Sequence, residues 1–369
     1  MALHYRTRTD LDSLPSYKAG KTPEVNPHLK TYKLSSNESP FEPLPEVLEA
    51  LSKKSNYNLY PEPFAASLRT KIAELHGVQE SQVLTSGGGL SIIYQVCDAL
   101  VQKPTDEIIY PWRSFEAYPI ATQIAGAVNV PVPLLNNEHD LLAMQAAITE
   151  KTKLIILCSP NNPTGTCISK QAFENFMKNV PQDLPVLLDE AYFEFVTDKE
   201  SVQGNEYLDK FPNLITLRTF SKAYGLAGLR IGYAITSTDL AQFLDKLSRP
   251  FEVSAAALDA AKISLDYRDK ALARVDEITA ERDRVHTALK DYLNESIMPK
   301  SQGNFIWFNV TKDSDSFTET LLLHGITARP YGTQEGVRVT ISDPEANDVL
   351  IKAVKNFTQH SQHKNKTTT

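Results

Sequence analysis

From residue 45 onward, the hydrophobic positions of the chain follow two alternating spacings. Stretches in which apolar residues recur every three or four positions predict amphipathic helices, and shorter uninterrupted apolar runs predict strands that are buried on both faces. The predicted helices are Pro45–Lys54, Ala65–His76, Leu90–Val101 and Ser169–Val180. The predicted strands, which we expect to be parallel, are Glu107–Tyr110, Leu154–Cys158, Val186–Leu188, Leu214–Leu217 and Arg230–Ile235.

This alternation predicts an α/β fold with a three-layer α/β/α, mainly parallel sheet, because right-handed crossovers place helices on both faces. After Arg249 the pattern changes and predicts a smaller α+β C-terminal domain. Its expected elements are a helix near 269–293, strands at Asn304–Val310 and Gly336–Ile341, and helices near Phe317–His324 and Pro344–Phe357. We expect an N-terminal arm (1–40) packing with the small domain, a large domain (41–250), a small domain (251–358) and a disordered tail (359–369).

Composition narrows the class of protein. At 369 residues the chain exceeds the roughly 250–300 residues at which single cores stop growing. The net charge of -7, without a long Lys/Arg cluster, argues against nucleic acid or an anionic membrane as the partner. No apolar run approaches the ~20 residues of a membrane span, and the three cysteines form no C-x-x-C pair. We therefore expect a soluble cytoplasmic protein with reduced thiols and no metal site.

Four polar motifs come directly after predicted strands or close to them. They are Ser159–Gly165 (S-P-N-N-P-T-G), Asp189–Tyr192 (D-E-A-Y), Thr219–Lys222 (T-F-S-K) and Gly228–Arg230 (G-L-R). Ligands of open α/β sheets bind at the carboxyl ends of the strands, so these motifs are expected to meet in one site.

Each motif has an ordinary explanation when it stands alone. The first is rich in turn residues, Asp189 could cap a helix, and Lys222 could be solvated, as most lysines are. Together they are more specific. A lysine amine becomes nucleophilic near neutral pH when it is buried beside cations, and an arginine fork such as that of Arg230 suits a phosphate. The glycines at 87–89 precede a predicted helix, whose N-terminus favours an anion.

These motifs, with Pro111–Tyr118 (P-W-R-S-F-E-A-Y) and Arg218–Tyr233, resemble the fold-type I aminotransferases that use pyridoxal 5′-phosphate (PLP). Within them, the histidinol-phosphate and aromatic aminotransferase branch is the most similar, from about residue 14 to 357. The resemblance implies that Lys222 binds PLP covalently and moves protons, that Asp189 faces the pyridine nitrogen, and that Asn162 and Tyr192 bind the 3′ oxygen.

The resemblance also implies roles for residues around the cofactor and the substrate. Phe115 would stack on the ring, and Tyr60 would reach the phosphate of a neighbouring subunit, giving a homodimer with shared active sites. The implied phosphate ligands are Gly87, Gly88, Gly89, Thr219, Ser221 and Arg230. The implied substrate ligands are Tyr17, Asn37, Arg329 and Arg338, with Arg338 holding the carboxylate. The chain departs from the family pattern at Leu59, Gly89 and Leu90.

The expected activity is transfer of an amino group between an aromatic amino acid and 2-oxoglutarate. Trp112–Phe115 and Arg329–Thr333 favour the aromatic aminotransferases over the alternative, a histidinol-phosphate aminotransferase. A decarboxylase on the same fold is a more distant alternative, since a fold does not fix its reaction. The acidic charge argues against a DNA-binding regulator built on this fold, and no G-x-G-x-x-G opens a dinucleotide-binding unit.

Overall fold

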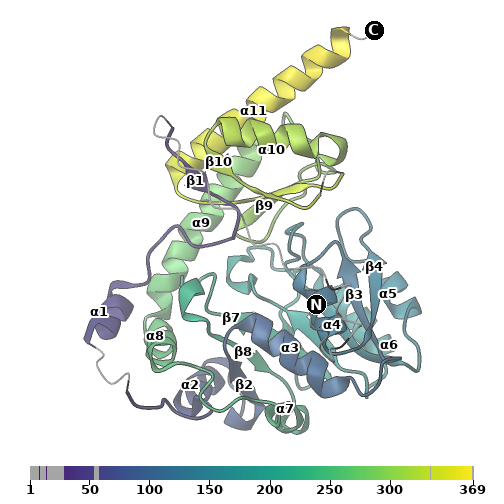
Figure 1. Ribbon diagram of the computed structural model, residues 1–369, viewed down its shortest axis with the longest axis vertical. Coiled ribbons are helices and arrows are strands. Elements are labelled where there is room, and N and C mark those ends of the chain that lie inside the picture. Colours follow the sequence, from purple (N-terminus) through teal and green to yellow (C-terminus); the bar gives the residue numbers. More distant parts are fainter. Residues whose placement is uncertain (1–7, 9–13, 15–28, 54–57, 333, 368–369) are drawn as a thin grey trace, which may run out of the picture.

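The computed structural model describes residues 8, 14, 29–53, 58–332 and 334–367, which form two units built on separate sheets (Figure 1). The large unit surrounds a seven-stranded sheet and the small unit surrounds a three-stranded sheet. The long helix α9 (Arg268–Leu289) runs from the large unit into the small one. Among the described residues, no helix is both long and apolar enough to cross a membrane.

The seven-stranded sheet has the order β2-β8-β7-β6-β5-β3-β4 and is mainly parallel, as predicted. Its strands are β2 (Val83–Ser86), β3 (Glu107–Trp112), β4 (Val128–Pro133), β5 (Thr152–Cys158), β6 (Val186–Asp189), β7 (Leu214–Thr219) and β8 (Gly232–Ile235). The expectation that Arg230–Ile235 forms a parallel strand is wrong, because β8 is antiparallel to both β2 and β7. The connection from β7 to β8 holds only a 3₁₀ turn, whereas a parallel crossover normally carries a full helix.

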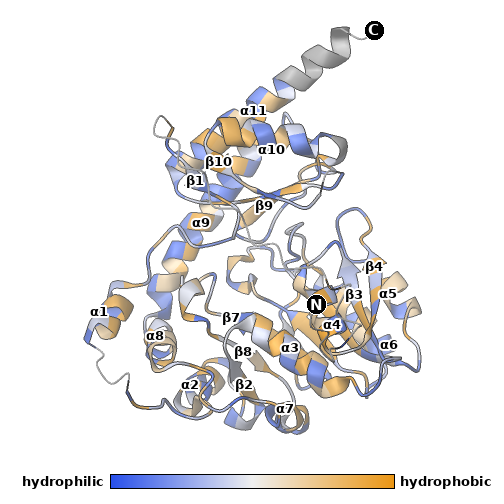
Figure 2. Cartoon of the chain, viewed as in Figure 1, coloured by the Kyte–Doolittle hydropathy of each residue, from blue (hydrophilic) through white to orange (hydrophobic). Residues whose placement is uncertain are grey.

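Helices cover both faces of this sheet, which confirms the three-layer prediction. On β5, Ile156 joins a buried cluster with residues of α3 and α4, and its neighbour Ile155 joins a second cluster with residues of α6 on the opposite face. Hydrophobic residues gather where these helices meet the sheet (Figure 2). The helices of the large unit are α1 (Pro45–Lys53), α2 (Ala66–His76), α3 (Gly89–Leu100), α4 (Ala117–Ile124), α5 (Leu141–Ala146), α6 (Lys170–Asn179), α7 (Thr238–Asp245) and α8 (Ala255–Asp266).

The sequence analysis did not predict six elements of the large unit: β2, β4, α4, α5, α7 and α8. β4 lies at one edge of the sheet, and several of its residues are exposed. Its sequence, V-N-V-P-V-P, therefore lacks the apolar run of a central strand. The helices α4, α5 and α7 span eight residues or fewer, too short for a clear helical period.

The small unit contains an antiparallel sheet of order β11-β12-β9, in which β9 is Phe305–Phe308, β11 is Arg329–Pro330 and β12 is Val337–Thr340. The arm contributes β1 (Tyr32–Lys33), which pairs in parallel with β10 (Ile326–Thr327). The remaining helices are α10 (Ser314–Leu323) and α11 (Pro344–Thr367). α11 projects beyond the small unit (Figure 1) and continues through 359–367, where we expected disorder. No Gly or Pro follows Pro344, so the sequence holds no strong helix stop.

Candidate active site

A cavity of about 390 Å³ lies at the carboxyl ends of β5, β6 and β7. The last residue of each strand, Cys158, Asp189 and Thr219, lines it. Its opposite wall comes from the small unit and the arm, with Arg329 and Arg338 among its residues. The motifs that follow the strands therefore meet in one place, as the topology of a parallel sheet predicts.

Lys222 lies in the wall of this cavity, three residues after β7. Its Nζ donates a hydrogen bond of 3.1 Å to the backbone oxygen of Ser36, which belongs to the arm. Burial, reinforced by the positive charges of Arg338 and Arg230 and opposed by Glu38, lowers the pKa of Lys222 to about 7. The amine is therefore able to gain and lose a proton near neutral pH.

Asp189 is buried beneath the same cavity, with 4% of its surface exposed. Its Oδ2 accepts a hydrogen bond of 2.7 Å from the hydroxyl of Tyr118, and its Oδ1 accepts one of 3.0 Å from the backbone N–H of Ala191. Burial raises the pKa of Asp189 to about 6, while these two hydrogen bonds act in the opposite direction. Near neutral pH the site thus holds a buried carboxylate that suits a cationic partner.

Tyr118 is a functional candidate that the sequence analysis missed. It lies at the end of the motif Pro111–Tyr118, so its position was in view, but nothing local indicated its partner. The side chain is fully buried in α4 and reaches the sheet from the helical layer.

Arg338 on β12 projects into the cavity from the small unit. Its guanidinium donates to Asn162 Oδ1 and to the hydroxyl of Tyr331 through Nη1, and to the backbone oxygen of Ser35 through Nη2. The Nε is buried and has no hydrogen-bond partner among the described residues. Because buried donors are normally satisfied, this Nε indicates that a ligand acceptor binds here.

Arg230 and the glycine turn form a cradle at the opposite end of the cavity. Arg230 donates to the backbone oxygen of Ala227 at 3.0 Å and approaches Ser221 Oγ at 3.5 Å. Gly88 has φ +105°, and a Cβ at this position would lie 2.6 Å from Arg230 Nη2. Only glycine therefore lets the backbone and the guanidinium lie together where α3 begins at Gly89. A helix N-terminus beside an arginine suits an anion.

Several other residues predicted for the site also lie at the cavity. Tyr192 accepts a hydrogen bond of 3.0 Å from Asn37 Nδ2, and the backbone N–H of Asn37 donates to Thr340 of the small unit. These bonds join the arm to both units around the site. The predicted residues that line the cavity are Gly89, Phe115, Asn162, Asp189, Tyr192, Thr219, Ser221, Lys222, Arg230, Arg329 and Arg338.

Five predicted residues are not in the lining. Asn37 is buried and bonds to Tyr192, which is in the lining. Gly87 and Gly88 precede Gly89 in the turn that forms the cradle. Tyr60 is 83% exposed and packs its ring 4.7 Å from that of Phe251, outside the cavity of its own chain. Tyr17 lies outside the described residues.

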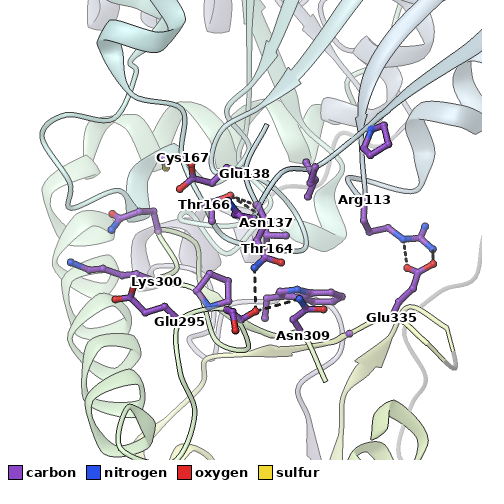
Figure 3. A pocket seen from close by; sticks show the side chains of 18 of the residues that line it. Arg113, Asn137, Glu138, Thr164, Thr166, Cys167, Glu295, Lys300, Asn309 and Glu335 are labelled. Atoms are coloured by element: carbon purple, nitrogen blue, oxygen red, sulfur yellow. Dashed lines mark hydrogen bonds and ion pairs between the residues drawn. The ribbon is translucent and has the colours of Figure 1, made fainter. Parts of the chain in front are cut away.

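A second, larger cavity of about 1000 Å³ lies between the two units (Figure 3). At one side Arg113 and Glu335 form an ion pair that joins the units. Arg113 also donates to the backbone oxygen of Tyr331, at 3.2 Å. The sequence analysis singled out the segment that contains Arg113 but did not predict this ion pair. With the bond to Tyr331, the pair fixes the loop after β11 against the large unit.

Comparison with known proteins agrees with this geometry. Residues 30–354 match the family model described as aminotransferase class I and II. An aromatic amino acid aminotransferase of Streptomyces avermitilis is 44% identical over 95% of this chain and 97% of its own length. The crystal structure of histidinol-phosphate aminotransferase from Sinorhizobium meliloti in complex with pyridoxal-5′-phosphate has a TM-score of 0.85 at 25% identity, covering 97% of this chain and 99% of that one.

A third comparison concerns the decarboxylase alternative. L-threonine-O-3-phosphate decarboxylase from Porphyromonas gingivalis has a TM-score of 0.76 at 23% identity over 89% of this chain and 99% of that one, a similarity of fold alone. Because a family model covers most of the chain and the Streptomyces enzyme matches it almost end to end, the chain is an aminotransferase of the class I and II family.

Proposed function

We propose that this aminotransferase moves the amino group of an aromatic L-amino acid to 2-oxoglutarate, with PLP as its cofactor. The observation that carries the proposal is a single cavity bounded by the amine of Lys222, the buried carboxylate of Asp189 and the unpartnered Nε of Arg338. An amino-group donor with a carboxylate needs such an arrangement, because its nitrogen and its carboxylate must be bound at the same time.

The residues present suit PLP. The family implies this cofactor, and the solved relative from Sinorhizobium meliloti was crystallised with it. Arg230 and the N-terminus of α3 suit its phosphate, and the missing side chain at Gly88 leaves room for it. Asp189 suits a protonated ring nitrogen, and Phe115 offers a flat face. When bound, PLP supplies a ring that withdraws electrons from the Cα of an attached amino acid.

The protein supplies the proton transfers. Lys222, with a pKa of about 7, would be the amine that holds the cofactor, and its Nζ would take up and return the proton at Cα of the donor. Its hydrogen bond to the oxygen of Ser36 directs Nζ toward the arm side of the cavity. Tyr192 and the amide donor of Asn162 would hold the 3′ oxygen of PLP, and Arg338 would hold the donor carboxylate.

Asp189 acts through its charge, and Tyr118 tunes that charge. We expect Tyr118→Phe to weaken PLP binding at acid pH and to move the acid limit of binding upward by about one pH unit. The Tyr118 hydroxyl donates to the carboxylate and so stabilises its ionised form. Removing the bond raises the pKa of Asp189, since a hydrogen bond to a charged group contributes about 1.5–3 kcal/mol and one pKa unit corresponds to about 1.4 kcal/mol.

The measurement for Tyr118→Phe is the dissociation constant of PLP from the apoprotein as a function of pH. Tyr110→Phe is the matched control, because Tyr110 is buried in the same cluster and donates instead to Asn129, at 3.1 Å. The control should reproduce the wild-type curve. An unchanged acid limit in Tyr118→Phe would show that this bond does not set the charge of Asp189.

Two observations support an aromatic donor. The relative from Streptomyces avermitilis, 44% identical in sequence, is an aromatic amino acid aminotransferase. The cavity is also lined by apolar and aromatic side chains, among them Leu90, Ile93, Phe115 and Tyr331. Histidinol phosphate is the second candidate, favoured by the two arginines that the small unit contributes to the cavity and by the solved relative from Sinorhizobium meliloti.

We further propose that the protein is a homodimer whose active sites are shared across the interface. Tyr60 is exposed and its ring packs against that of Phe251, and Leu59 beside it is 62% exposed. Phe64 adds a third exposed apolar side chain in the same segment. Large exposed apolar groups that lie together favour a partner surface, and Tyr60 would reach the phosphate cradle of the second copy.

Steady-state kinetics test the proposed reaction. With 2-oxoglutarate as acceptor, L-phenylalanine is expected to give phenylpyruvate and glutamate in equal amounts, with a higher kcat/KM than L-histidinol phosphate. A higher kcat/KM for histidinol phosphate would assign the enzyme to that donor instead. Release of carbon dioxide without glutamate would identify a decarboxylase.

A further inference from the structure

The two arginines that the small unit contributes to the cavity lie directly opposite each other in its sheet. Arg329 on β11 pairs with Arg338 on β12 in antiparallel register, so both side chains leave the same face of the sheet. Both guanidiniums also approach the ring of Tyr331, at 5.7 and 5.9 Å from its centroid. Two like charges at opposite positions repel each other, and together they would attract an anion of double charge.

Glu116 changes this balance. Its Oε2 accepts a close hydrogen bond from Arg329 Nη2, and the pair joins Glu116, which directly precedes α4, to the small unit. Both residues line the cavity, and only 9% of Arg329 is exposed. Among the described residues, Glu116 therefore places one negative charge beside the two positive charges of Arg329 and Arg338. Such a site suits a single carboxylate better than a phosphate dianion.

We propose that Glu116 determines substrate specificity by charge: its pairing with Arg329 lets the cavity favour donors with one carboxylate and disfavour donors with a phosphate. The inference rests on the proposed function, and it assigns a role to a residue beyond the expected site. Glu116 contacts an arginine rather than the reacting atoms, so it is a specificity-determining residue and not a catalytic one.

The size of the effect follows from one unit charge. At an effective dielectric of about 20, a charge several ångströms from the bound anion changes its binding by one or more factors of ten. Glu116→Gln removes the charge and keeps the shape and one acceptor oxygen. It is expected to raise the ratio of kcat/KM for L-histidinol phosphate to that for L-phenylalanine about tenfold, mainly through KM for the phosphate.

A binding experiment without turnover gives a second reading. Phenyl phosphate is a dianion at pH 8, and 3-phenylpropionate is a monoanion of similar size. By isothermal titration calorimetry of the holoenzyme, Glu116→Gln is expected to bind phenyl phosphate about tenfold more tightly than the wild type. It should bind 3-phenylpropionate only about threefold more tightly, because a monoanion feels half of the change in charge. Glu116→Asp keeps the charge and is expected to keep the wild-type preference between the two ligands.

Glu335→Gln is the matched control. It removes an ion pair of the same kind, with Arg113, but Glu335 lines the cavity between the units and not the active-site cavity. Its effect on the two donors and on the two ligands should be equal. A shift in preference as large as that of Glu116→Gln would mean that any lost ion pair has this effect, and the proposal would be wrong.

The outcomes separate the two proposals. Equal preferences in Glu116→Gln and the wild type, with an unchanged melting temperature, would overturn the role of Glu116 alone. A wild type that does not transaminate L-phenylalanine would overturn the proposed function, while the two dead-end ligands would still report on the charge of Glu116. Phenyl phosphate that binds more tightly to Glu116→Gln, but not to Glu116→Asp or Glu335→Gln, would support selection of the substrate by the charge of Glu116.

Discussion

Lys222→Ala is expected to lower turnover with every amino donor by at least about a thousandfold. The variant loses both the amine that attaches the cofactor and the group that carries the proton, and a positioned acid or base contributes about 10²–10⁴-fold by itself. Folding should persist, because a buried amine whose pKa is lowered to about 7 costs stability rather than adding to it. PLP is expected to bind without covalent attachment and to be removable by dialysis.

Mass spectrometry after borohydride reduction and single-turnover kinetics measure the two losses separately. Lys210→Ala serves as the control, since Lys210 is an exposed lysine paired with Glu174 on the surface. It should retain covalent cofactor and full turnover. A small primary amine added to Lys222→Ala is expected to restore part of the proton transfer. Retention of wild-type turnover in Lys222→Ala would remove this lysine from the mechanism.

Arg338→Lys is expected to lower kcat/KM by at least about thirtyfold for amino acid donors and for the 2-oxo acid acceptor. Both ligands carry the carboxylate that Arg338 would bind, and losing one partner of a buried, hydrogen-bonded charge pair costs about 2–5 kcal/mol. A lysine keeps the charge but cannot present the flat fork of donors that suits a carboxylate. It also cannot maintain the bonds to Asn162, Tyr331 and Ser35 together.

A donor without the carboxylate distinguishes binding from a structural defect. The slow half-reaction of the holoenzyme with phenethylamine should be nearly the same in Arg338→Lys and the wild type, while that with L-phenylalanine falls. Equal losses for the two amines would show that Arg338 supports the site through Asn162 and Tyr331 and does not contact the carboxylate.

The sequence predicted the layers of the fold better than the directions of its strands. The apolar run of β5 distributes Ile155 and Ile156 to opposite faces, and this alternation is visible in the chain. The direction of β8 depends on what fills the connection before it. That connection contains the turn with Lys222 and a short 3₁₀ helix instead of a crossover helix. The apolar pattern alone does not show that the crossover helix is missing.

The residues of the site also fall into two groups, those that the sequence could predict and those that it could not. Lys222, Asp189 and the other residues near the strand ends could be predicted because each lies at the end of an apolar run or within a few residues of it. Tyr118 and Glu116 could not, because their partners lie 71 and 213 positions away in the chain. No local spacing joins such pairs, and only the packing of α4 against the sheet and the small unit brings them together. The roles of all these residues stay predictions; that of Tyr60 also requires a second copy of the chain, and Tyr17 lies outside the described residues.

Titration of the purified holoenzyme with L-phenylalanine, in the absence of any acceptor, tests the central claim most directly. The visible absorbance of the lysine-bound cofactor should fade, one phenylpyruvate should form per active site, and 2-oxoglutarate should then restore the absorbance. Absorbance that does not respond to L-phenylalanine but fades with L-histidinol phosphate would contradict the aromatic donor. Absorbance that responds to neither, or is missing from the purified protein, would contradict the assignment of a PLP site at Lys222.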